Sequence, residues 1–360
     1  MSAEGVAVKD VSPIASASQD YRASVGRRVL ILVGLAVAVL ISFAVDLATG
    51  PYNYPVTDVI ATLFSPENAD TKMRVILWEI RMPVALMALT VGASLSVAGA
   101  QMQTILANPL ASPFTLGISA AAGFGAALAL VFGVALVPFV SAFVIPLNAF
   151  VMAMLAAGVI YFFSRMRGVT VETIVLLGIA LVFTFNALQA LLQYLASEQA
   201  LSAVVFWTMG SLVKATWTKV AVTAAVLAAT VPLFIRQAWS LTALRLGDAK
   251  AESLGVNVKR LRLTTLILVS LLAAIPVSFV GSIGFIGLVG PHIARMLVGE
   301  DQRFFMPASI LCGALLLSAT SVLSKLLIPG AILPIGVATA LVGVPFFFSL
   351  IFSSRRRNSW

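Results

Sequence analysis

Long apolar runs, separated by charged or proline-containing breaks, occupy almost the whole chain. A helix needs roughly 20 mostly apolar residues to cross a hydrocarbon core about 30 Å thick. Runs that approach this length are found at about 29–45, 83–107, 114–136, 142–164, 173–196, 218–236, 263–281, 285–298, 306–327 and 334–353. The pattern predicts an all-α, polytopic integral membrane protein with about ten transmembrane helices.

Small residues recur at helix-packing intervals inside two of these runs. Gly92, Ser96 and Ala100 share one helix face, and the third run repeats the pattern from Gly117 to Gly125. Such faces let helix backbones approach closely inside a membrane. They predict tight packing within the chain, with a dimer interface as the alternative.

Composition supports a bilayer environment. The chain has 360 residues, of which 60% are hydrophobic and only 10% charged, whereas an average soluble domain is about 25% charged. The formal net charge is +9, but the basic residues lie at the ends of apolar runs. That placement is typical of topology signals and lipid head groups, so no nucleic-acid partner is expected.

The uneven distribution of lysine and arginine predicts the orientation. With an even number of spans both termini lie on one side, and that side also holds the basic segment 236–262. The side richer in Lys and Arg is cytoplasmic. We therefore expect a cytoplasmic N-terminal tail at 1–28, a transmembrane domain at 29–354 with a cytoplasmic loop at 237–262, and a basic cytoplasmic tail at 355–360.

Several kinds of chemistry have no support in the sequence. There is no G-x-x-x-x-G-K-[ST] loop for ATP phosphates. Cys312 and His292 are the only residues of their types, so neither a metal site nor a disulfide is expected. No charged residue occurs between Arg81 and Arg165, although intramembrane ionisable groups usually mark ion-coupled transport. The alternatives that stay open are an ion-coupled secondary transporter or channel and, with less support, a membrane-embedded enzyme.

Uncharged polar residues do occur inside the apolar runs. Asn186, Gln189 and Gln193 fall on one face of the run at 173–196, and Gln101 and Gln103 lie late in the run at 83–107. They predict either hydrogen bonds between helices or a wetted translocation path without charge. The sequence alone leaves both interpretations open.

The segment from Leu246 to Val256 differs from the other loops. Asp248 can cap a short helix there and Gly255 can end it. A short amphipathic helix on the cytoplasmic face could enter a cleft on a soluble partner. The alternative is an ordinary solvated loop.

Ordered motifs between about residues 74 and 352 resemble the FecCD-type permeases, the membrane subunits of ABC importers for ferric siderophores, haem and cobalamin. The most specific motif reads GSIGFIGLVGPHIAR, from Gly281 to Arg295. The others are Arg81-Met82-Pro83, Gly99–Gln103, Asn108–Pro113 with Leu116-Gly117, Trp207–Leu212, Leu246–Val256 with Asn257, Arg260 and Arg262, Leu333–Gly336, and Gly343-Val344-Pro345.

The resemblance implies a type II ABC importer permease fold in a bacterial inner (plasma) membrane. It also implies a second permease subunit, two ATP-binding cassette subunits that hold ATP and Mg²⁺, and a periplasmic or lipoprotein substrate-binding protein. No cofactor and no catalytic residue is then expected in this chain, and the cargo is an iron-siderophore or a related metal chelate.

The resemblance also assigns roles to residues. Contact with the ATPases is expected for Leu246, Gly247, Asp248, Ala251, Ser253, Leu254 and Gly255. The resemblance adds Asn108, Pro109 and Leu110 to the expected translocation path, for which Gln101, Asn186, Gln189 and Gln193 are candidates through their polar side chains alone. Arg81 and Lys325 are expected to dock the binding protein. Val84 and Ile332 replace an arginine and a glutamate that the family often has there, which leaves both homodimer and heterodimer open.

Overall fold

A computed structural model describes residues 13–50, 54–68, 70–137, 143–166, 168–328 and 330–357, and in these ranges it contains helices and connecting loops. The helices are α1 (Pro13–Ala48), α2 (Val56–Phe64), η1 (Pro66–Asn68), α3 (Thr71–Val75), η2 (Ile76–Arg81), α4 (Met82–Ile105), α5 (Ile118–Phe132), α6 (Val144–Ser164), α7 (Val171–Leu195), α8 (Glu198–Thr208), α9 (Trp217–Leu244), α10 (Asp248–Ser253), α11 (Val258–Val280), α12 (Ile286–Val298), α13 (Gln302–Leu326) and α14 (Ile335–Arg357). The all-α prediction is confirmed.

The predicted spans correspond one by one to helices. Within the described residues, seven helices are long and apolar enough to cross a membrane, and α5, α12 and α14 are shorter apolar helices. Helix α12, which covers the eighth run, begins only at Ile286 and has 13 residues. Together these helices match the ten expected runs.

Three elements differ from expectation. Helix α1 begins at Pro13, so the segment expected as a tail is helical from there, while residues 1–12 and 358–360 of the two expected tails lie outside the described residues. Helix α8 lies between the predicted runs at 173–196 and 218–236, where the apolar pattern predicts no span. A π-helix, η2, joins α3 to α4 without a break. The apolar pattern did not show these elements because their sequences are polar or short.

Side chains at helix starts account for several boundaries. Thr170, Ser197, Thr216, Asn257 and Asp301 each accept a hydrogen bond from a backbone N–H in the first turn of the helix that follows. Such caps satisfy amide groups that have no partner inside the helix. Helices α7, α8, α9, α11 and α13 therefore start where their caps lie.

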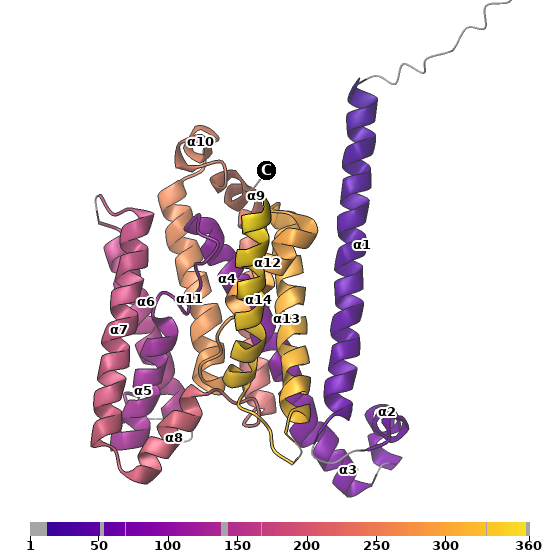
Figure 1. Cartoon of the computed structure of the whole chain (residues 1–360), viewed down its shortest axis with the longest axis vertical. Coiled ribbons are helices and arrows are strands. Elements are labelled where there is room, and N and C mark those ends of the chain that lie inside the picture. Colours follow the sequence, from indigo (N-terminus) through magenta and orange to yellow (C-terminus); the bar gives the residue numbers. More distant parts are fainter. Residues whose placement is uncertain are drawn as a thin grey trace, which may run out of the picture.

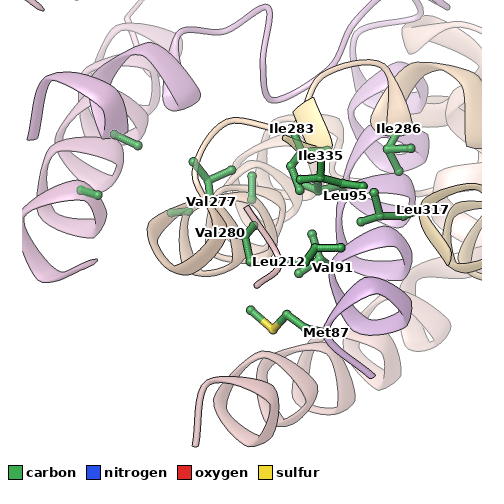
Figure 2. Packing of buried hydrophobic residues seen from close by; sticks show 14 of the residues in the cluster. Met87, Val91, Leu95, Leu212, Val277, Val280, Ile283, Ile286, Leu317 and Ile335 are labelled. Carbon is green, nitrogen blue, oxygen red and sulfur yellow. The ribbon is translucent and has the colours of Figure 1, made fainter. Parts of the chain in front are cut away.

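Helix α4 forms the centre of the bundle, and α9, α11, α12 and α13 pack around it (Figure 1). Met87, Val91 and Leu95 of α4 meet Val277 of α11 and Leu317 of α13 in the main apolar cluster (Figure 2). Helix α1 stands at the edge of the bundle against α13, and most of its apolar surface faces outward. The bundle therefore has one buried central helix and a lipid-exposed rim.

The two ends of the bundle carry different elements. Helix α10, the first residue of α1 and the last turn of α14 lie at one end, and α2, α3 and α8 lie at the opposite end (Figure 1). The described ends of the chain are thus on the same side as α10, as an even number of spans requires. We call the α10 end the inner end and the α8 end the outer end.

The small-residue faces pack inside the chain. A Cβ on Gly92 would lie 2.3 Å from the Gly313 carbonyl oxygen of α13, and the Ser96 hydroxyl donates a 2.6 Å hydrogen bond to the Ser309 carbonyl. A Cβ on Gly125 would lie 2.3 Å from the Asn148 carbonyl of α6. The prediction of tight internal packing is confirmed, and these faces are not free for a dimer interface.

Candidate functional site

Helix α10 is a six-residue helix between two glycines with left-handed backbone. Gly247 precedes it at φ +95° and Gly255 follows it at φ +83°. Side chains other than glycine rarely adopt such angles, so glycine suits both turns. Gly255 ends the helix as expected. Asp248 does not cap it, because Gly247 holds the cap position and the Asp248 side chain turns instead to Arg262.

Most of the predicted contact residues of this segment face solvent. Leu246 is 58% exposed and Leu254 is 50% exposed, and Gly247, Asp248, Ser253 and Gly255 are also exposed. Exposed leucines beside a short helix form an apolar surface that a partner could cover.

Ala251 is the exception among the predicted ATPase-contact residues. It is fully buried, in an apolar cluster that also contains residues of α4, α9 and α11. It therefore seats α10 on the bundle and cannot contact a partner in this conformation.

The turn after α4 carries three of the predicted path residues. Ala107 has φ +45°, and the Asn108 carboxamide oxygen accepts a 2.9 Å hydrogen bond from the Leu110 amide. Pro109 and Leu110 are exposed. The turn is thus held in a strained, defined shape that presents Leu110 outward, as a path-lining position requires.

The polar face of α7 is divided between two roles. Asn186 is exposed and Gln193 is partly exposed, so both stay candidates for the path. The Gln189 carboxamide oxygen lies 2.5 Å from the position of a Cβ on Gly123 of α5. Gln189 therefore fills the contact between α5 and α7, and its amide is a packing group.

Gln101 is fully buried, so the prediction that it lines a path is wrong for this conformation. Its amide nitrogen donates to the Gln302 carboxamide oxygen at 3.0 Å, and Gln302 donates to the Thr104 hydroxyl at 2.9 Å. The Gln103 oxygen accepts a 2.8 Å bond from Arg295. These bonds join α4 to α12 and α13, which was the alternative interpretation of both glutamines.

The two predicted docking residues are also buried. Arg81 donates to the backbone carbonyls of Leu47 and Ala48 at 2.9 and 3.0 Å, at the C-terminal end of α1. Lys325 lies 2.7 Å from the Asp46 carboxylate, and Asp46 is fully buried. Both cations hold α1 to the bundle, so neither is presented to a partner in this conformation.

The Asp46–Lys325 pair gives a stability prediction. Asp46→Asn is expected to lower the free energy of unfolding by about 3–5 kcal/mol, because it leaves the Lys325 ammonium buried without its counter-charge. Thermal unfolding of the detergent-solubilised protein measures this. The matched control is Asp58→Asn on α2, which removes an exposed carboxylate and should leave the melting temperature unchanged. Equal melting of both variants would contradict the assigned role.

Asp46 was missed at the sequence level. The signal was available, since a lone carboxylate ends the first apolar run. Its partner, however, is 279 residues away in the sequence, and no local pattern connects the two.

Two cavities lie at opposite ends of the bundle. The outer cavity is about 700 Å³, and apolar side chains including Phe206 and Trp207 line it together with Arg81, Lys214 and Lys325. The inner cavity is about 600 Å³ and lies between α10, α11 and the connection from α6 to α7. Asp248, Arg262 and Ile105 are among its lining residues.

Comparisons with known proteins show which class of membrane protein this chain is similar to. The FecCD transport family model matches residues 29–353. An ABC transporter permease protein of Methanocaldococcus jannaschii is 37% identical over 94% of this chain and 99% of its own length. The hemin transport permease HmuU of Yersinia pestis is 35% identical over 90% of this chain and 97% of its own. An inward-facing metal-chelate type ABC transporter superposes with a TM-score of 0.79 at 30% identity, over 90% of this chain and 99% of that one.

The fold and these relatives define a membrane-spanning permease subunit of an ABC importer. The chain belongs to the FecCD transport family.

Proposed function

We propose that this chain, with a second permease subunit, imports an iron-siderophore or a related metal chelate through a bacterial inner membrane. Two separate ATP-binding cassette subunits hold ATP and Mg²⁺ and supply the energy. A periplasmic or lipoprotein binding protein delivers the cargo to the outer end, and both chain termini are cytoplasmic. The permease itself binds no cofactor and catalyses no reaction in this proposal.

The observation that carries the proposal is the inner-end helix α10. Exposed Leu246 and Leu254 flank it, buried Ala251 packs it against α9 and α11, and Arg262 links its Asp248 to Ile105 at the end of α4. Because one side of α10 is exposed and the other is joined to the bundle, α10 can move with a bound partner and displace the membrane helices that it contacts. The turn at Asn108–Leu110 directly follows α4, so nucleotide-driven movement of α10 can reach the path.

The cargo class follows from the relatives and from the outer cavity. Relatives are named for hemin, iron chelatin and Fe(3+)-citrate import. The outer cavity is large and mainly apolar, and the exposed Lys214 is among its lining residues, which favours a bulky chelate with some negative charge. Exposed Lys72, Arg74 and Lys214 at the outer end are better placed than Arg81 and Lys325 to meet acidic groups of a binding protein.

Transport assays test the proposal directly. The permease, reconstituted in vesicles with its ATPase and binding protein, is expected to take up ⁵⁵Fe-labelled chelate only when ATP is present, and vanadate should stop uptake. Ionophores that collapse ion gradients should leave uptake unchanged. Uptake by the permease without any ATPase would overturn the proposal in favour of an ion-coupled transporter or channel.

A further inference from the structure

Arg262 in the first turns of α11 forms hydrogen bonds both to α10 and to the C-terminal end of α4. Its two terminal nitrogens donate to both carboxylate oxygens of Asp248 in α10, at 2.7 and 2.8 Å. Its Nε donates to the backbone carbonyl of Ile105 at 2.9 Å. Ile105 is the last residue of α4. One guanidinium therefore spans from α10 to the end of the central helix.

The bond from Arg262 is to the backbone carbonyl of Ile105, at the point where α4 ends and the following turn begins. The carbonyls of Gln103 and Thr104 accept bonds from Asn108 and Ala107 in the turn that follows. The Ile105 carbonyl, which comes next, accepts the bond from Arg262. The position of Arg262 thus sets where α4 ends and where the strained turn at Ala107 begins.

The inner cavity limits the other routes by which α10 could act. The inner cavity of about 600 Å³ lies between α10 and the connection from α6 to α7, so this route offers less packed contact than the route through Arg262. Alongside the apolar packing of Ala251, which holds α10 against α9 and α11, the Asp248–Arg262–Ile105 bonds link α10 to the α4 end. A bidentate, charge-assisted pair transmits direction as well as distance, which a single methyl contact does not.

We propose that Arg262 is a positioning residue that transmits movement of α10 to the turn at Ala107–Leu110. When α10 is displaced, the Asp248 carboxylate moves the guanidinium, and the guanidinium moves the α4 end. This inference rests on the proposed function, because it assumes that an ATPase moves α10. It assigns the coupling to one side chain in place of the loop as a whole.

Two substitutions separate charge from geometry. Arg262→Gln is expected to lower chelate uptake per ATP hydrolysed about ten-fold, because it removes charge-assisted hydrogen bonds of the kind that contribute most. Arg262→Lys keeps the charge but lacks the planar fork, so an intermediate loss is expected. The matched control is Arg260→Gln, an exposed arginine two residues earlier on the same helix, which should behave as the wild type.

A labelling experiment reports on transmission itself. In an Ala107→Cys background, at an exposed residue of the same turn, the rate of labelling by a membrane-impermeant thiol reagent should change when ATP is added, because the turn moves. Cys312 is buried and should react slowly. Adding Arg262→Gln should abolish the ATP-dependent change, while Arg260→Gln should preserve it. A purely structural role for Arg262 would leave the ATP-dependent change intact.

A charge swap separates the two bonds. Asp248→Arg combined with Arg262→Asp can restore the ion pair but cannot donate to the Ile105 carbonyl from position 262. The swap is expected to keep an ion pair between α10 and α11 and still leave uptake per ATP low. Full recovery of uptake by the swap, or wild-type uptake in Arg262→Gln, would overturn the inference. Absence of ATP-dependent uptake in the wild-type complex would instead overturn the proposed function.

Discussion

Replacement of Gly99 by alanine is expected to prevent the chain from accumulating as a folded protein in the membrane. A Cβ at this position would lie 1.8 Å from the carbonyl oxygen of Gly287 and 2.6 Å from its carbonyl carbon. Both groups are backbone, so neither can rotate away, and α4 and α12 would have to separate. Overpacking of a well-packed core costs about 1–3 kcal/mol or more, and here the contact lies on the central helix.

Gly158→Ala on α6 is the matched control for this prediction. No atom lies within 4 Å of a Cβ at Gly158, and alanine is favoured over glycine within a helix by about 1 kcal/mol. Membrane yield and melting temperature of the Gly158 variant should equal or exceed those of the wild type. Equal yields of the Gly99 and Gly158 variants would show that α4 and α12 do not pack as described.

Replacement of Gly255 by valine is expected to abolish uptake while the permease still inserts into the membrane. Gly255 has open space around it but adopts φ +83°, where a β-branched residue is strained by roughly 1–2 kcal/mol. The strain falls on the turn that ends α10, so the helix should lose its orientation toward a partner. Uptake and ATPase activity are measured in the reconstituted complex, and ATP hydrolysis is expected to continue without transport.

Gly133→Val controls for backbone strain alone. Gly133 ends α5 at φ +67° and also has open space around it, but it lies far along the chain from α10. This variant should keep the coupling of hydrolysis to uptake. If both glycine variants transport normally, α10 is not the element that couples the ATPase to the path.

The positions of the membrane helices could be predicted from sequence because burial in lipid demands long apolar runs, which are local signals. Residue roles were harder to predict. Arg81 and Lys325 look like outer-face cations in the sequence, but their partners, the α1 carbonyls and Asp46, lie 33 to 34 and 279 residues away. Gln101 similarly pairs with Gln302, 201 residues away. A single sequence carries no information about such distant pairs.

Ala251 shows a second limit. Helix α10 has only six residues, which is too short for a periodic pattern to separate its buried face from its exposed face. The glycine at its end was predictable, because a turn with positive φ has a strong residue preference. The inward direction of Ala251 depends on how α9 and α11 hold the segment, and that is a property of the tertiary structure.

The contrast between α1 and α4 bears on how such a chain can change over generations. The most apolar window of α1 is 6% buried within the protein, whereas that of α4 is 83% buried. Lipid accepts almost any apolar side chain, so the outward-facing positions of α1 can vary freely, whereas Ser42, Asp46 and the buried Leu47 must keep their partners. Each substitution on α4 must instead be accommodated by the side chains packed against it. We therefore expect homologues to diverge first at the lipid-facing rim and last on the central helix.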